Sequence, residues 1–183
     1  MKAYQDASLA PVRRAKALLE EMTLAEKIGQ LNQRLYGFRI YERKCVNGED
    51  TIELSEEFCQ EVEKYSGLGV LYGLYRADPW ADKNYETGLT GVLSKKAYNQ
   101  VQRYVLEHSR LGIPVMMSSE CPHGHQALDG YLLPVNLLAG ATFDPAMVRA
   151  AYRVSGRQLQ NMGVDFALMS MLDLSLIHIS EPT

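Results

Sequence analysis

The strongest constraint on the fold is an alternation of short apolar runs with longer amphipathic segments. Apolar runs of strand length lie at residues 68–72, 115–117 and 163–169. Between them, residues 94–110 and 144–159 carry apolar side chains at helical spacing. A strand–helix–strand–helix–strand order implies right-handed crossovers, because parallel strands need a long connection. The sequence therefore predicts an α/β fold built on a parallel sheet.

Further helices are expected before the first of these runs. Pro11 suits a first helical turn, where no N–H is needed. Thr23 and Glu26 have the spacing of a capping box, in which each side chain bonds the backbone N–H of the other residue. Ser55 is the expected N-cap of a helix over residues 54–65.

Three segments are expected to be irregular. Residues 33–53 mix aromatic and charged side chains around Asn47-Gly48, a turn signal, and are interpreted as an excursion. Residues 73–92 and 118–133 follow the first two predicted strands and contain several glycines. Long loops after strands often carry function, so these two are the first places to look for a site.

Length and charge exclude several classes of protein. The chain has 183 residues, whereas a complete eight-stranded α/β barrel takes ~250 residues. Lys plus Arg number 19 and Asp plus Glu number 22, so the formal charge of −3 offers no field for nucleic acid or an anionic membrane. No apolar run reaches the ~18 residues of a membrane span, and no signal-peptide core opens the chain. Together with three widely spaced cysteines, this predicts a cytoplasmic protein.

The last ten residues, 174–183 (LSLIHISEPT), do not continue the alternation. They resemble the conceptual translation of a common transposon-based sequencing adapter. The expectation is that the reading frame ran off a DNA fragment and that the natural protein continues past Asp173. His178 then carries no functional weight. The alternative is a natural strand over residues 176–179 followed by a turn.

The densest polar cluster, residues 118–125 (SSECPHGH), follows the second predicted strand. Parallel α/β folds bind ligands at the carboxyl ends of their strands. In one interpretation, His123 and His125 chelate a divalent ion with Glu120 or Cys121 as a further ligand. In a second, the histidines hold the loop through hydrogen bonds, and Cys121 is a small apolar filler.

The third interpretation of these loops is carbohydrate binding. A carboxylate such as Glu120 can accept hydrogen bonds from two sugar hydroxyls at once. The loop after the first predicted strand adds Arg76, Asp78 and Trp80, which supply a cation, a carboxylate and an aromatic face for a pyranose ring. The alternative is a surface Arg–Asp pair with Trp80 in the local core.

Six segments in consecutive order carry a family resemblance. They are residues 21–31 (EMTLAEKIGQL), 109–115 (SRLGIPV), 120–125 (ECPHGH), 133–134 (LP), 140–145 (GATFDP) and 163–166 (GVDF). They resemble the opening helix, the entry into the second barrel strand, the acidic-x-x-His-Gly motif and the following blocks of glycoside hydrolase family 3, the β-glucosidase and β-xylosidase family. The resemblance covers about residues 9–173.

The resemblance implies an N-terminal (β/α)8-like barrel followed by an α/β sandwich domain. It implies hydrolysis of terminal β-linked sugars with retention, in which an Asp attacks the anomeric carbon and a second carboxylic acid protonates the leaving oxygen. The acidic residue of the His-Gly motif, here Glu120, would hold sugar hydroxyls, and His123 would support that loop. Arg76 and Asp78 complete the predicted substrate-binding set. Neither a cofactor nor a metal is implied.

The resemblance also implies missing parts. Nothing in residues 1–173 matches the family's Ser-Asp-Trp-like nucleophile motif, its acid/base, or its Arg and Lys-His motifs. The prediction is a partial barrel, N-terminal helices plus about three βα units, that is inactive alone and that aggregates or stays molten because its sheet edge is open. The alternatives are a metal-dependent hydrolase using His123 and His125, and a non-catalytic sugar-binding module.

Overall fold

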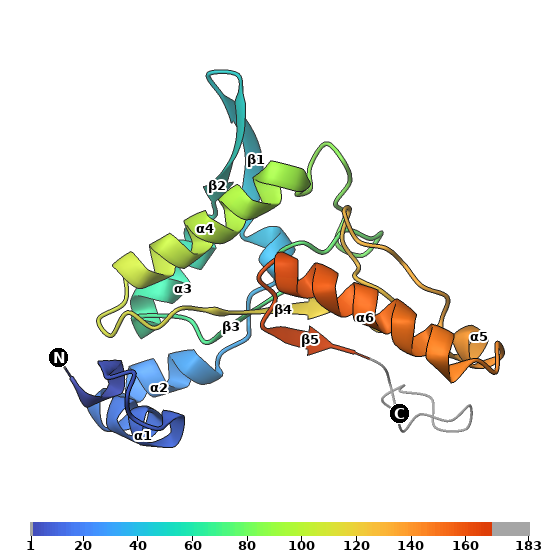
Figure 1. Ribbon diagram of the computed structural model, residues 1–183. Helices are drawn as coiled ribbons and strands as arrows, with labels where there is room; N and C mark the ends of the chain where they lie inside the picture. Colours follow the sequence, from blue (N-terminus) through green and yellow to red (C-terminus); the bar gives the residue numbers. More distant parts are fainter. Residues whose placement is uncertain (1, 170–183) are drawn as a thin grey trace, which may run out of the picture.

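A computed structural model describes residues 2–169 of the chain. Its centre is a parallel three-stranded sheet in the order β3-β4-β5, with α4 and α6 as the crossover helices (Figure 1). These elements are β3 (Val70–Tyr72), α4 (Gly91–Glu107), β4 (Met116–Glu120), α6 (Pro145–Asn161) and β5 (Phe166–Leu168). The predicted α/β fold and its parallel strands are confirmed. The predictions about residues 170–183, the adapter-like tail included, lie outside the described residues.

The helix caps predicted in the N-terminal half are present. Thr23 Oγ1 accepts from the backbone N–H of Glu26 at 3.2 Å, and Glu26 Oε2 accepts from that of Thr23 at 2.7 Å. Ser55 Oγ accepts from the backbone N–H of Phe58 at 3.3 Å. The helices they begin, with the one before them, are α1 (Pro11–Glu21), α2 (Leu24–Leu31) and α3 (Glu56–Tyr65).

The segment interpreted as an excursion is a β-hairpin. β1 (Tyr41–Val46) pairs antiparallel with β2 (Glu49–Leu54), and the hairpin projects from the body (Figure 1). Asn47 and Gly48 form the two-residue connection with φ of 53° and 81°. Two consecutive positive φ angles are what an Asn-Gly hairpin turn requires, so the turn signal was right and the two strands around it were missed.

Several boundaries differ from the sequence prediction, and some short elements were not predicted. β4 runs on through Ser118, Ser119 and Glu120, which were expected in a loop. Its pairing with β5 keeps these polar residues in the sheet, since Ser118 and Glu120 are opposite Phe166 and Leu168. α4 begins three residues early, at Gly91. A short helix, α5 (Asn136–Gly140), and two 3-10 turns, η1 (Ala3–Gln5) and η2 (Gly37–Arg39), were not predicted.

The hydrophobic core lies between the sheet, α3, α4 and the hairpin. Leu71 of β3 is opposite Met117 of β4, and both side chains are buried against Val101 of α4 and Phe58 of α3 in one cluster. By contrast α1 and α5 bury no residue. Among residues 2–169, no helix is both long enough and apolar enough to cross a membrane.

Candidate functional site

A polar cluster lies at the carboxyl ends of β3 and β4. Tyr72 ends β3 and is opposite Ser118, so Glu120, two residues further along β4, lies on the same face of the sheet. The Tyr72 hydroxyl donates to Glu120 Oε1 at 2.8 Å. The end of one strand therefore fixes the carboxylate at the end of the next.

The chain turns sharply after β3 and brings Arg76 onto this pair. Gly73 has a φ of 72°, a conformation that favours glycine, and its carbonyl accepts from the N–H of Arg76 at 3.2 Å. Arg76 Nη1 contacts the Tyr72 hydroxyl and lies 3.4 Å from Glu120 Oε1. The cation predicted from the first loop and the carboxylate predicted from the second are therefore partners in an ion pair.

Asp78 completes the charged group. Its Oδ2 accepts from Arg76 Nε at 2.7 Å, and its Oδ1 accepts from the backbone N–H of Ala81 at 2.8 Å. Glu120, whose side chain is 30% exposed, is the most accessible of the three charged side chains; Arg76 is 14% and Asp78 is 22% exposed. Two carboxylates and one guanidinium give the cluster a formal charge of −1, with Glu120 nearest to solvent.

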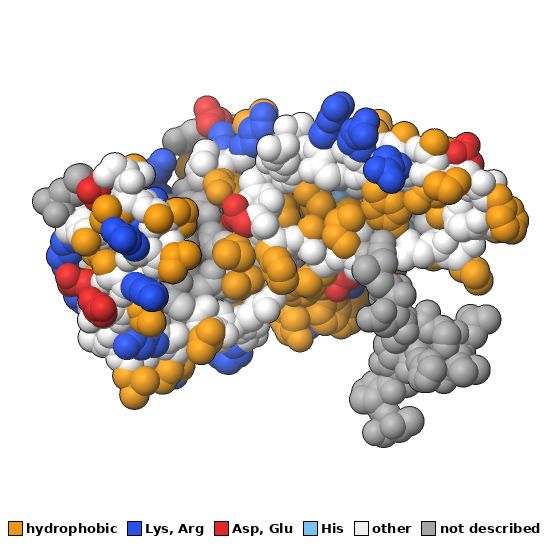
Figure 2. Space-filling model, turned by 60° about the horizontal axis from the view of Figure 1, so that its bottom comes forward, with side chains coloured by type: hydrophobic (Ala, Val, Ile, Leu, Met, Phe, Trp, Pro, Cys, Tyr) orange, Lys and Arg blue, Asp and Glu red, His pale blue; other side chains and the backbone are white. Residues whose placement is uncertain are grey.

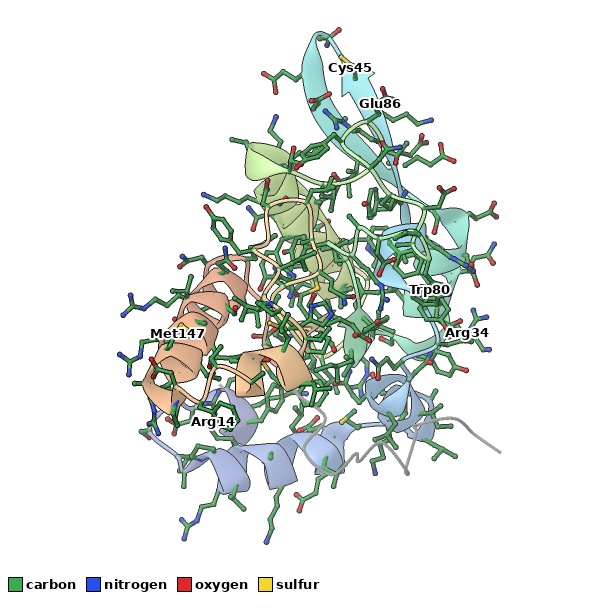
Figure 3. The ribbon with its side chains drawn as sticks, turned by 90° about the vertical axis from the view of Figure 1, so that its right-hand side faces the viewer. Arg14, Arg34, Cys45, Trp80, Glu86 and Met147 are labelled. Atoms are coloured by element: carbon green, nitrogen blue, oxygen red, sulfur yellow. The ribbon has the colours of Figure 1, made fainter. Side chains whose placement is uncertain are left out.

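Aromatic rings border the cluster. The Arg76 guanidinium lies 4.5 Å from the centroid of the Trp80 ring, and Trp80 remains half exposed. The rings of Tyr36 and Phe38 approach the Trp80 ring at 5.1 Å each in edge-on geometry. Figure 3 shows Trp80 and Met147 on opposite sides of the view, so Trp80 lies away from the N-terminal end of α6. Trp80 is thus neither fully core nor an isolated surface ring.

Sequence reasoning missed Tyr36 and Tyr72. Tyr36 comes from the segment before the hairpin and reaches the site through an isolated parallel bridge to Tyr72. Tyr72 was counted only as the end of an apolar strand. A polar hydroxyl on the last residue of a buried strand is a signal that could have marked it, because such hydroxyls usually need a partner.

His125 is a buried structural residue. It is fully buried, its Nε2 lies 2.9 Å from Ser119 Oγ, and the Tyr75 ring stands edge-on to it. Burial lowers the pKa of His125 to about 4, so the imidazole is neutral at neutral pH. Burial likewise raises the pKa of the Cys121 thiol. The contact with Ser119 of β4 agrees with the interpretation in which His125 holds the loop by a hydrogen bond, while His125 Nδ1 has no hydrogen-bond partner within residues 2–169.

His123 is not hydrogen-bonded to the charged cluster. Its carbonyl accepts from the backbone N–H of Leu133 at 2.7 Å, while its buried Nδ1 has no hydrogen-bond partner within residues 2–169. The same part of the chain holds no group of three or more His, Cys, Asp or Glu side chains placed to bind a metal ion. The structure therefore gathers Arg76, Asp78 and Glu120, and leaves His123 as a neighbour in the loop.

Comparison with known proteins gives the family. Residues 23–178 match the family described as the glycosyl hydrolase family 3 N-terminal domain. The chain belongs to glycoside hydrolase family 3. The matched range includes the opening helix α2, both loops of the site and the whole sheet, so the resemblance of the sequence segments is confirmed.

Two relatives illustrate the membership in glycoside hydrolase family 3. A protein of Formosa agariphila named "Putative beta-xylosidase" is 28% identical over 173 residues, which cover 94% of this chain and 21% of that protein. A solved β-glucosidase from Erythrobacter marinus superposes with a TM-score of 0.64 at 26% identity, over 91% of this chain and 19% of that one. The chain therefore spans about a fifth of the length of either relative.

Proposed function

We propose that this chain is the N-terminal piece of a retaining glycoside hydrolase acting on terminal β-linked sugars, of β-glucosidase or β-xylosidase type. The observation that carries the proposal is Glu120, held at the carboxyl end of β4 by Tyr72 and Arg76. Family membership and the names of the two relatives point to the same class of reaction. In this proposal the side chains of the cluster bind hydroxyls of the sugar ring in the subsite where cleavage occurs.

The chemistry of the cluster suits binding rather than bond cleavage. A retaining glycosidase needs two carboxyl groups ~5 Å apart, one free to attack carbon and one able to donate a proton. Glu120 Oε1 is already engaged by Tyr72 and Arg76, and both oxygens of Asp78 accept hydrogen bonds. The nucleophile and the acid/base are therefore proposed to come from parts of the enzyme outside residues 2–169.

The exposed face of the sheet supports a barrel continued by further strands. Every second residue of β4 lies on one face of the sheet; these are Met116, Ser118 and Glu120. Phe166 of β5 is opposite Ser118 and lies on the same face. Met116 is 46% and Phe166 is 49% exposed, and the buried Ser118 hydroxyl has no hydrogen-bond partner among the described residues. Figure 2, which views the molecule from below the sheet of Figure 1, shows hydrophobic side chains gathered across the middle of that side. In a closed barrel this face is interior.

The test compares this chain with the enzyme extended by its natural coding sequence past Asp173. We expect the extended enzyme to hydrolyse an aryl β-glucoside or β-xyloside with retention, and the 183-residue chain to show no turnover. In the extended enzyme, Glu120→Ala should lower kcat/KM by about 100-fold or more, since it removes a charged partner of the substrate. Glu107→Ala, at the exposed end of α4, is the matched control.

Three results would contradict this proposal. Turnover that co-purifies with the 183-residue chain and that Glu120→Ala abolishes would show that the chain itself is catalytic. Stoichiometric zinc retained after dialysis, and lost in His123→Ala, would favour the metal-dependent hydrolase. A fragment that binds glucose or xylose in a calorimetric titration, without any hydrolysis by the extended enzyme, would identify a sugar-binding module instead.

A further inference from the structure

The two carboxylates of the cluster differ in which oxygens are engaged. Both oxygens of Asp78 accept hydrogen bonds, from Arg76 and from the backbone of Ala81. In Glu120 only Oε1 is engaged, by the Tyr72 hydroxyl and the Arg76 guanidinium. Glu120 Oε2 has no hydrogen bond within residues 2–169. Asp78 therefore has both oxygens hydrogen-bonded to the protein, whereas Glu120 has one oxygen available to accept a hydrogen bond from a ligand.

The guanidinium of Arg76, like the carboxylate of Glu120, has only some of its polar atoms in contact with other residues. Its Nε donates to Asp78, its Nη1 contacts the Tyr72 hydroxyl, and its central carbon lies 4.5 Å from the centroid of the Trp80 ring. Among the described residues no hydrogen bond reaches its Nη2. Because the guanidinium is planar, the contacts to Nε and Nη1 fix the direction in which Nη2 points.

We propose that Tyr72 and Asp78 are positioning residues, which hold Glu120 and Arg76 so that Glu120 Oε2 and Arg76 Nη2 form an acceptor–donor pair for two neighbouring hydroxyls of one sugar ring. One hydroxyl donates to Glu120, and the next accepts from Arg76. This inference rests on the proposed glycosidase function and deepens it. It also changes the role expected of Asp78, which acts through Arg76 instead of touching the sugar.

The Tyr72 hydroxyl is suited to this task because it contacts both members of the ion pair. It donates to Glu120 Oε1 and contacts Arg76 Nη1, so it holds the same oxygen and the same nitrogen that approach each other in the ion pair. A fork-to-fork Arg–Glu pair would use both carboxylate oxygens and both outer nitrogens, leaving none for a ligand. Burial and the neighbouring Glu120 raise the pKa of Tyr72, which keeps the hydroxyl protonated as a donor.

The experiment measures kcat/KM of the extended enzyme on an aryl β-glycoside and on its monodeoxy analogues, each lacking one ring hydroxyl. In the wild-type enzyme, removal of either of two adjacent hydroxyls should lower kcat/KM by about 10- to 100-fold, the loss expected for a hydrogen bond to a charged group. Tyr72→Phe should lower kcat/KM on the parent sugar by a similar factor. On the two deoxy analogues, the same substitution should lower kcat/KM little further. Tyr131→Phe, an exposed tyrosine in the loop after β4, is the matched control.

The pattern across analogues separates positioning from a general structural role. If Tyr72 only supports the fold, Tyr72→Phe lowers kcat/KM equally on every analogue, and the inference is wrong. Asp78→Asn should behave like Tyr72→Phe on the analogue that lacks the hydroxyl bound by Arg76: the substitution should lower kcat/KM little further on that analogue. If Asp78→Asn instead couples to a third hydroxyl, Asp78 binds the sugar directly and its positioning role is overturned.

The outcome also distinguishes this inference from the function on which it rests. An extended enzyme that hydrolyses none of the glycosides overturns the proposed function, and the positioning roles fall with it. An enzyme that hydrolyses the parent sugar, but whose Tyr72→Phe variant matches Tyr131→Phe on every analogue, keeps the glycosidase and overturns only the positioning roles.

Discussion

The two crossover helices of the sheet have the same length but different surroundings. α4 and α6 each span 17 residues, and both carry an apolar stripe. α4 buries Leu93, Ser94, Ala97, Val101 and Val105, whereas α6 buries only Ser155 and Leu159. Met147 and Val154 of α6 stay about half exposed. Both helices carry an apolar stripe in sequence, yet the stripe of α4 is buried and that of α6 is only partly covered.

The difference arises from what the neighbouring segments supply. The hairpin and α3 cover α4 from outside the sheet: Gln100 of α4 donates to the carbonyl of Ile52 in β2, and Tyr104 of α4 packs against Phe58 of α3. No described element plays that part for α6 and α5. Leu137 of α5 is 75% exposed, and Phe143, between the two helices, is 91% exposed. A helix becomes stable mainly through burial of its apolar face, so the α4 half is expected to be ordered and the α6 half to depend on further chain.

The largest effect should come from the open half. We expect the 183-residue chain to aggregate or stay molten, because exposed apolar faces and an open strand edge attract other molecules. Replacing Leu137 and Leu138 by serine should raise the fraction of soluble monomer in size-exclusion chromatography. A sharp, cooperative thermal transition in a monomeric sample of the unaltered chain would show that the two halves do not differ in this way.

Matched phenylalanine substitutions should separate the halves by several kcal/mol. In the serine-substituted background, Phe58→Ala should destabilise the fold by about 3 to 5 kcal/mol, the usual cost of removing a fully buried aromatic side chain. Phe143→Ala should change stability by less than about 0.5 kcal/mol, since its side chain is already exposed. Urea unfolding followed by the fluorescence of Trp80 measures both. Equal effects would mean that Phe143 is covered in solution.

The third test asks whether the N-terminal helices belong to the packed half. Hydrogen bonds from Arg110 lower the pKa of Glu26 from 4.5 to about 2, against the opposing effect of burial. A lowered pKa in the folded state adds stability above pH 4.5, which is lost as the pH falls toward 2. We expect stability to drop by about 1 to 2 kcal/mol over this range, with the exposure of Arg110 limiting the value.

Variants assign that loss of stability to the ion pair. In Glu26→Gln the part of the pH dependence due to this carboxylate should disappear, whereas Glu20→Gln, on the exposed side of α1, should keep it. Urea midpoints measured at pH 6 and pH 3 give the comparison. A pH dependence identical in both variants would mean that α2 is not attached to the body through Glu26 and Arg110.

The smallest effect is expected at the surface of the packed half. Lys96 of α4 forms an ion pair with Glu49 of the hairpin at 3.0 Å, and both side chains are substantially exposed. Lys96→Ala should cost less than about 0.5 kcal/mol, because water and salt screen exposed pairs. A larger loss in urea unfolding would indicate that charge, and not the buried contacts of Ile52, fastens the hairpin to α4.

Elements whose signals are local could be predicted residue by residue. The capping box of Thr23 and the N-cap of Ser55 depend on contacts over three or four residues. The hairpin was missed although Asn47-Gly48 was recognised as a turn, because strand pairing was not considered on its two sides. Glu120 was placed in a loop for a different reason: its strand conformation depends on β5, almost fifty residues further along.

The candidate site was predicted in part for the same reason. Arg76, Asp78 and Glu120 could be chosen from residue type and from their place after strands, but their pairing could not. Tyr72 and Glu120 are 48 residues apart in sequence and meet only through the register of β3 with β4. That register also decides which oxygens of the two carboxylates are engaged by the protein.

The sequence by itself determined the longer helices, the caps of α2 and α3, and the parallel arrangement of β3, β4 and β5, since periodicity and capping are short-range properties of the chain. Only the tertiary structure decided that α4 is enclosed while α6 is not, and that Tyr72 contacts both Arg76 and Glu120. Burial and strand register join residues far apart in the chain, so local patterns carry no information about either.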